Sequence, residues 1–325
     1  MHGWHSPQIE AGKTMFATRI PANPDVPARL LQLSDHQDAI RADALSPLAD
    51  HAYLRHEGRR ITADHADSVI ARHGLSGVEE LMLLLLPDAE KVATPPISGF
   101  HVGTVGRAAG SGALTLGGNI EFPGAHLGQA IHGEGFVTTR AFLRGESLSH
   151  IALTAAHPCG HCRQFLTEFE SAPDLRLIDP RGGTYVMDDL LPFPFNPAAL
   201  ETAGAIPGHV AHDLALADGP ARDLLIHAGN RAHVPYSHCP SALVLELGDG
   251  TQVWGTSIES CAYNPTIMPA QAALIMLLDH GHSYGDIARA WFARPKGAVV
   301  DLARASADLL AAVAPDASLT ILEWN

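Results

Sequence analysis

The sequence reads IHGEG at residues 131–135 and HPCGHCRQF at residues 157–165. Cys159 and Cys162 stand three positions apart, so on one helix their thiolates share a face and can bind the same ion. His132 can supply a third ligand from the preceding helix, which leaves one tetrahedral position open for water. Catalytic zinc sites have this arrangement, whereas structural sites are closed by a fourth Cys or His. The spacing therefore predicts a catalytic Zn²⁺ site.

Glu134 is the candidate catalytic residue of this site. In mid-helix, His132 and Glu134 would diverge by about 200°, so both can reach one site only at the start of a helix. There the imidazole can bind the metal while the carboxylate reaches the adjacent water. The cysteines also open a helix, whose dipole stabilises thiolates. His161 lies between the cysteines and is expected to point away from the face they share.

Helix and strand patterns alternate along the chain, which predicts an α/β sandwich. Ser76 and Glu79 form a capping pattern ahead of a leucine block. The stretches HVGTVG and ALTLGG flank a Gly/Ser turn and predict a hairpin. The expected elements are short helices after an irregular start in residues 1 to about 60, a buried helix over 77–86, the hairpin from residue 100, a helix over about 127–144, a strand over 150–156 and a helix opening at the cysteines.

The sequence contains an internal repeat. PISGFHVGTVGRAAGSGALTLGGNIEF from Pro96 lines up with PYSHCPSALVLELGDGTQVWGTSIES from Pro235. Each copy has a hairpin, then NIE or SIE, then a helix of small residues. With Glu259 aligned to Glu121, the second copy offers only Met268, Pro269 and Ala270 near the places of the ligand and the glutamate. It therefore cannot assemble the same zinc site, and we expect it to act as a scaffold.

Charge and hydropathy narrow the possible partners of the 325-residue chain. Its 21 basic and 35 acidic residues give a net charge of −14, which argues against a nucleic acid polymer. The longest apolar run, Leu81 to Leu86, ends at Pro87 and is far short of the roughly 20 residues of a membrane-spanning helix. The first residues show no secretory signal, so a cytoplasmic protein is expected. A small, neutral or weakly charged substrate fits best.

The combination of H-x-E with P-C-x-x-C is the signature of zinc-dependent nucleobase deaminases. From Ser76 to the C-terminus, the chain resembles the dimeric, two-domain cytidine deaminases of bacteria. The resemblance is carried, in family order, by the blocks ISGFHVG, GGNIEF, IHGE, HPCGHCRQF, LLPFPFNP and SIESCAYNPTIMPAQAAL. It implies a duplicated three-layer α/β/α sandwich with a small N-terminal helical segment, and a homodimer whose partner helps close each site. The expected divisions are an N-terminal segment (1–76), a catalytic domain (77–189), a crossing linker (190–221) and a catalytically broken domain (222–325).

The resemblance also implies the reaction, which is hydrolysis of cytidine and 2′-deoxycytidine to uridine and 2′-deoxyuridine plus ammonia, in pyrimidine salvage. Zn²⁺ would make hydroxide available for attack on C4 of the cytosine ring, with Glu134 as the proton shuttle. By the same resemblance, Asn119 and Glu121 bind the sugar hydroxyls and Phe100 packs by the base. For Phe100, packing in the core is an open alternative.

Two further residues are assigned to the substrate by resemblance. Phe195 resembles the aromatic that reaches across the dimer toward the partner's base, although Phe193 beside it leaves the register open. Gly133 would offer a backbone group to the base. Most relatives have alanine there, and Gly135 and His157 are also atypical.

Three alternative functions are compatible with parts of this pattern. One is another zinc deaminase, acting on guanine, on adenosine in tRNA or on a modified nucleoside. The second is a zinc-containing pseudoenzyme or scaffold, which leaves Glu134 without a use. The third is a thiol redox protein, which leaves both His132 and Glu134 unexplained.

Overall fold

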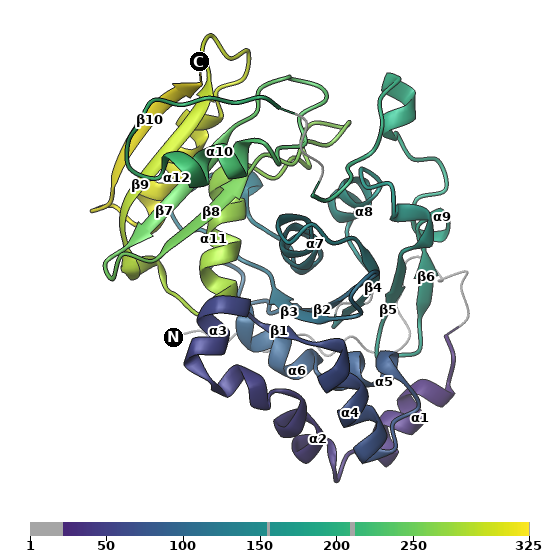
Figure 1. Cartoon of the computed structure of the whole chain (residues 1–325). Coiled ribbons are helices and arrows are strands. Elements are labelled where there is room, and N and C mark those ends of the chain that lie inside the picture. The colour runs from purple at the N-terminus through teal and green to yellow at the C-terminus, as the bar shows by residue number, and fades with distance from the viewer. Residues whose placement is uncertain (1–21, 155–156, 209–211, 325) are drawn as a thin grey trace.

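The computed structural model describes residues 22–154, 157–208 and 212–324. It contains two β-sheets, one in each half of the chain, with helices on both faces (Figure 1). The predicted α/β fold is therefore confirmed. None of the helices within these residues has the length and apolar character that crossing a membrane requires.

The first sheet has six strands in the order β1-β3-β2-β4-β5-β6. All neighbours pair antiparallel except β4 and β5, which are parallel. The strands are β1 (Arg60–Ile61), β2 (Gly103–Ala108), β3 (Leu114–Gly118), β4 (Leu148–Leu153), β5 (Arg176–Ile178) and β6 (Thr184–Val186). The predicted hairpin is confirmed as β2 and β3, which lie between β1 and β4 in this sheet.

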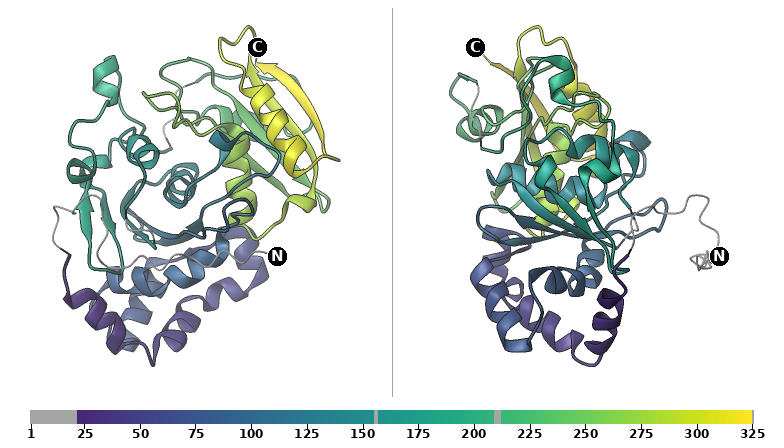
Figure 2. Two further views of the ribbon diagram at one scale, coloured as in Figure 1. Left: turned by 180° about the vertical axis from the view of Figure 1, so that it is seen from behind. Right: turned by 90° about the vertical axis from the view of Figure 1, so that its right-hand side faces the viewer.

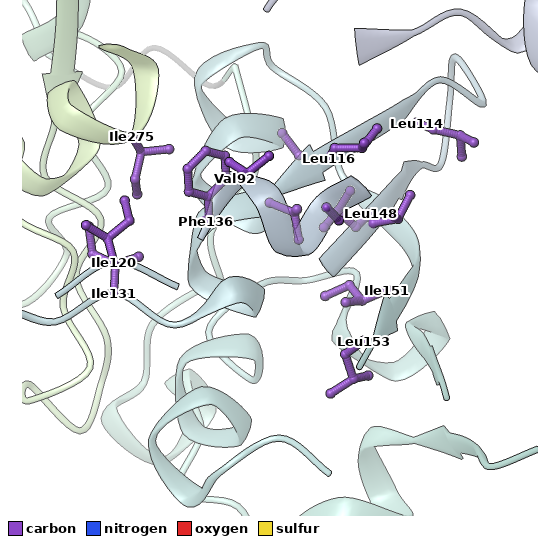
Figure 3. Close-up of a cluster of buried hydrophobic side chains, with 14 of the residues drawn as sticks. Val92, Leu114, Leu116, Ile120, Ile131, Phe136, Leu148, Ile151, Leu153 and Ile275 are labelled. Atoms are coloured by element: carbon purple, nitrogen blue, oxygen red, sulfur yellow. The ribbon is translucent and has the colours of Figure 1, made fainter. Parts of the chain in front are cut away.

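Helix α7 (Gly133–Leu143) packs on β2 and β3, with α8 (Gly160–Leu166) beside it. Glycines allow the close approach, because a Cβ on Gly117 would lie 2.5 Å from the Phe136 ring. Figure 3 shows part of the surrounding core, in which Ile275 from the second half joins Ile120 and Ile131. The IHGEG and HPCGHCRQF motifs therefore lie at the starts of α7 and α8, on the same side of the first sheet.

The N-terminal helices cover the opposite face of this sheet (Figure 2). They are α1 (Asp25–Gln32), α2 (Gln37–Ala44), α3 (His51–Glu57), α4 (Ala63–His73), α5 (Val78–Leu84) and α6 (Leu86–Ala89). The expected short helices are thus confirmed from Asp25 onward, while residues 1–21, with the expected irregular start, lie outside the described residues. Since β1 pairs with β3, the N-terminal segment also contributes a strand to the catalytic sheet.

The second sheet has four strands in the order β10-β9-β7-β8. The strands are β7 (Ala242–Leu247), β8 (Gln252–Thr256), β9 (Ile287–Pro295) and β10 (Ser318–Trp324), and the helices of this half are α10 (Arg222–Gly229), α11 (Pro269–Asp279) and α12 (Leu302–Val313). A short helix, α9 (Met187–Leu190), precedes the segment that crosses between the halves. Buried apolar side chains in the described part of the chain form two clusters. Along β7, Leu243 and Leu245 belong to one cluster and Val244, on the opposite face of the strand, belongs to the other. Both faces of this sheet are therefore covered.

The two halves repeat the same arrangement of elements, as the sequence repeat predicts. Each hairpin has strands of six and five residues and is followed by a helix of eleven. The bridge between Ile120 and Ile131 recurs between Ile258 and Ile267. In both halves the last pair of strands in the repeated unit is parallel.

Three predicted boundaries change in the structure. The helix expected over 127–144 begins only at Gly133, because Ile131 is held in an extended bridge to Ile120. The helix expected over 77–86 spans Val78–Leu84 without a Ser76 cap, since it is Glu80 that accepts from the Ser76 amide, at 2.6 Å. The strand expected over 150–156 is Leu148–Leu153, and residues 155 and 156 lie outside the described residues.

A buried ionic cluster joins the two halves. Asp279, at the end of α11, has no exposed surface and accepts from Arg140 Nε at 2.7 Å and from Arg144 Nη2 at 2.9 Å. The Arg59 amide donates to its other oxygen at 3.1 Å. Helix α7, which begins at the candidate site, is therefore tied at its far end to α11 and to the N-terminal segment.

Candidate active site

His132, Cys159 and Cys162 come together as predicted. His132 Nδ1 lies 3.3 Å from each cysteine Sγ, and the two Sγ atoms lie 3.6 Å apart. Tetrahedral zinc, with bonds of about 2.3 Å to sulfur and about 2.0 Å to nitrogen, would place these atoms roughly 3.5–3.8 Å apart. The three residues therefore fit Zn²⁺, and they form the group able to hold a metal in the described part of the chain.

Two helix N-termini meet at this group. His132 is the N-cap residue of α7, and Cys159 is the N-cap residue of α8, where its Sγ accepts from the Cys162 amide at 3.5 Å. The α8 amides stabilise negative charge on the sulfur atoms. Hydrogen bonding to Cys162, helped by His132, lowers the pKa of the Cys159 thiol to about 3. The predicted placement of both motifs at helix starts is confirmed.

Glu134 lies in the first turn of α7 with its carboxyl group beside the Cys162 thiol. It is only 4% exposed, and this burial raises its pKa above the usual value. His161 lies outside the metal-binding group, with its ring centroid 6.1 Å from that of His132. The site thus contains three ligand atoms and a nearby buried carboxyl group.

Asn119 and Glu121 hold the loop that carries Phe100. The Asn119 side chain accepts from the Val102 amide at 2.8 Å and donates to the Phe100 carbonyl at 2.9 Å. Glu121 accepts from the amides of Ile97 and Ser98, each at 2.8 Å, and from the Ser98 hydroxyl. Burial opposes ionisation of Glu121, but these hydrogen bonds outweigh it and lower the pKa of the carboxyl group.

Phe100 is 61% exposed, so the alternative that it packs in the core is wrong. Phe195 lies in the crossing segment and is also exposed, while its carbonyl accepts from Gln164 Nε2 and from the Cys261 thiol. Gly133 is buried at the first position of α7, between the metal ligand and Glu134. Sequence reasoning missed Ser98, although the repeat contains a signal, since Ser98 aligns with Ser237.

The second half has the same loop without the metal ligands. Met268 is the N-cap residue of α11, in the place of His132, and Ala270 stands where Glu134 does. Glu259 accepts from the amides of Tyr236 and Ser237, each at 3.1 Å, and from the Ser237 hydroxyl. The interpretation of this half as a copy without the zinc site is consistent with this geometry.

Comparison with known proteins gives the family. Residues 76–174 and 187–307 match two family models, both described as the cytidine and deoxycytidylate deaminase zinc-binding region. A cytidine deaminase of Klebsiella pneumoniae is 38% identical over 237 residues, which cover 72% of this chain and 80% of the relative. A cytidine deaminase of Salmonella typhi is 37% identical over 260 residues, which cover 80% of this chain and 85% of the relative.

A solved cytidine deaminase from Mycobacterium leprae is 28% identical to this chain, with a TM-score of 0.32. The match covers 35% of this chain and 97% of the solved one. The sequence relatives cover most of both chains at well over 30% identity, and the zinc-binding family models match both halves. This chain therefore belongs to the family of zinc-dependent, two-domain cytidine deaminases.

Proposed function

We propose that the protein hydrolyses cytidine and 2′-deoxycytidine to uridine and 2′-deoxyuridine with release of ammonia, as part of pyrimidine salvage in the cytoplasm. The observation that carries the proposal is the buried Glu134 carboxyl group beside a three-ligand metal site. Zinc, when bound, supplies a Lewis acid that brings the pKa of water toward neutrality. Three protein ligands leave a tetrahedral position for that water.

Glu134 moves the protons in this proposal. It takes a proton from the attacking water and delivers protons to N3 and then to the departing amino group, so that ammonia leaves and uracil forms. A shuttle works best when its pKa lies near the operating pH. Burial shifts the pKa of Glu134 upward, which is the direction that this role requires.

Asn119, Glu121 and Phe100 form the nucleoside-binding side of the site in this proposal. Asn119 and Glu121 bind the sugar hydroxyls, while the exposed Phe100 ring packs by the base. Gly133 offers a backbone group to the base from the first turn of α7, where amide groups lack partners within the helix. The ionised state of Glu121, favoured by its lowered pKa, suits it to accept from hydroxyl groups.

The proposal is tested by measuring ultraviolet change and ammonia release with cytidine, 2′-deoxycytidine and free cytosine, at known zinc content. We expect turnover of both nucleosides. Full zinc occupancy with no ammonia from any of the three would overturn the assignment. Ammonia from modified nucleosides alone would then favour a deaminase of another substrate, and none at all would favour a scaffold.

Metal removal is expected to abolish turnover, and added Zn²⁺ is expected to restore it. Cys162→Ala should lose bound zinc, because a ligand to the ion disappears. Cys239→Ala removes a buried cysteine outside the metal-binding group and should keep its zinc. Metal content and ammonia release measured on the same samples check this. Undiminished turnover by the zinc-free protein would contradict it.

Glu121→Gln is expected to raise KM for cytidine, because the amide replaces a charged acceptor. Hydrogen bonds to charged groups contribute about 1.5–3 kcal/mol, which corresponds to roughly 10–100-fold in kcat/KM. Glu259→Gln is the matched control, since Glu259 makes the same loop contacts in the half without zinc ligands. Steady-state kinetics of both variants would check the prediction, and equal changes in KM would contradict it.

We also propose a homodimer formed through the crossing segment, within the domain divisions expected from the sequence. Large apolar side chains are exposed along this segment, with Phe193 94% exposed and Phe195, Leu200 and Ile206 each at least 40% exposed. Several exposed large apolar side chains in one segment are typical of a protein interface. Light scattering should give twice the chain mass, and Phe193→Ser should weaken association. A monomer at micromolar concentration would contradict the proposal.

A further inference from the structure

Thr104 lies directly against the peptide that links the zinc ligand to the proton shuttle. Its side chain projects from β2 toward α7 and has no exposed surface. Thr104 Oγ1 donates to the Gly133 carbonyl at 2.9 Å. Gly133 follows His132 and precedes Glu134, so this hydrogen bond anchors the backbone at the point from which both side chains extend.

The same threonine occupies the space that a side chain at position 133 would need. A Cβ built on Gly133 would lie 2.6 Å from Thr104 Cγ2 and 2.9 Å from Thr104 Oγ1. Real Cβ contacts essentially never fall below 3.0 Å, so one of the two residues would have to move. The glycine at position 133 is therefore matched to a threonine 29 positions earlier in the chain.

The surrounding structure restricts movement of both Thr104 and Gly133. Thr104 belongs to a central strand, paired with Gly117 on one side and Leu153 on the other. Its β-branched side chain has few rotamers available. Helix α7 already lies very close to the sheet, because a Cβ on Gly106 of β2 would lie only 3.0 Å from Val137 Cβ. An added methyl group at position 133 would therefore displace the first turn of α7.

We propose that Thr104 is a positioning residue, and that the Thr104–Gly133 pair sets the placement of His132 and Glu134 relative to each other. The pair acts through two contacts. The hydroxyl group holds the Gly133 carbonyl, and the methyl group fills the place of a Cβ. This inference rests on the proposed function, because its effect on turnover requires Glu134 to be the shuttle.

Four variants separate the two contacts. Gly133→Ala should lower kcat/KM for cytidine at least 10-fold with zinc retained, because the methyl group collides with Thr104. The double variant Thr104→Ala/Gly133→Ala removes that collision but also the hydroxyl group, so it should be more active than Gly133→Ala and recover only to about the level of Thr104→Val. Thr104→Val keeps the shape without the hydroxyl group and should lower kcat about 3–10-fold, the worth of one neutral hydrogen bond. Thr104→Ser keeps the hydroxyl group and should stay within about threefold of the parent.

Gly135→Ala is the matched control, because its Cβ would meet only Ile131 Cγ2, at the ordinary distance of 3.7 Å. It should change kcat/KM by less than about twofold. Melting temperatures of all the variants, measured in parallel, identify any loss of folding. A double variant no more active than Gly133→Ala, or a Thr104→Val protein with the kcat and KM of the parent, would overturn the proposal.

The absorption spectrum of Co²⁺-substituted protein provides a readout that does not depend on turnover. Displacement of His132 should shift the ligand-field bands in Gly133→Ala, and the double variant should move them back toward the parent positions. If the parent deaminates none of the three substrates, the proposed function fails, yet these spectra still report on the pair. If the parent is active and the spectra of all the variants coincide, only the positioning inference fails.

Discussion

Glu134→Gln is expected to lower kcat for cytidine by about 10²–10⁴-fold, the usual contribution of general acid–base catalysis. The amide has nearly the size of the carboxyl group but cannot accept the proton from water or pass it to the base. Because Glu134 lies outside the metal-binding group, the variant should hold as much zinc as the parent. Steady-state kinetics and metal analysis on the same preparation check both expectations.

The Glu121→Gln protein provides the contrast for this measurement. There we expect the change mainly in KM, whereas Glu134→Gln should change kcat, as expected for an interaction that acts in the transition state. A Glu134→Gln protein with more than a third of the parental kcat would contradict the shuttle role. Loss of zinc together with activity would instead identify Glu134 as part of the metal site.

Asp279→Ala is expected to lower the free energy of unfolding by about 3–5 kcal/mol, the usual cost of leaving a buried charge without its partner. Arg140 is 1% exposed and Arg144 is largely buried, so neither guanidinium can turn to water without opening the contact between α7 and α11. Urea unfolding at pH 7 measures this difference. Asp38→Ala is the control, because Asp38 is 87% exposed beside Arg41 and such pairs contribute only about 0–1 kcal/mol.

The effect of Asp279 should depend on pH with a definite sign. Burial opposes ionisation of this carboxyl group, but Arg140 and Arg144 outweigh it and lower the pKa. A carboxyl group with a lowered pKa stabilises the fold above the pKa it has when unfolded, about 3.9. This contribution is lost as the pH falls through the folded pKa. The difference between parent and Asp279→Ala should therefore be constant near neutrality and shrink in acid, and a difference that grows in acid would contradict the ion cluster.

The zinc site could be predicted from sequence because its residues stand in two short motifs, each at the start of one helix. Cys159 and Cys162 share the start of one short helix, so their spacing alone indicates a shared ion. His132 and Glu134 are likewise fixed by the start of α7. The second half was identified from its repeat, which placed Met268 and Ala270 where the ligand and the glutamate stand in the first half.

The remaining features depend on contacts between distant residues. The start of α7 was predicted too early, because no local signal shows that Ile131 pairs with Ile120. Thr104 carries no motif, and its role appears only when β2 lies under Gly133. The cluster around Asp279 joins residues 139 positions apart, and nothing in the composition of either helix indicates it. The spacing of short motifs therefore predicted the chemistry, whereas the contacts that hold those motifs in place depend on the tertiary structure.

Because the chain is duplicated, its two halves can be compared to separate residues that support the fold from residues that belong to the metal site. The contacts of Glu121 with the Ser98 loop recur at Glu259 and Ser237, where no metal ligands stand. In both copies the loop amides thus have a carboxylate acceptor, so this contact supports the loop whether or not a metal site lies beside it. His132 and Glu134, in contrast, are replaced by Met268 and Ala270 at the start of α11. The two copies thus distinguish contacts that the fold uses in both halves from side chains that stand only beside the metal site.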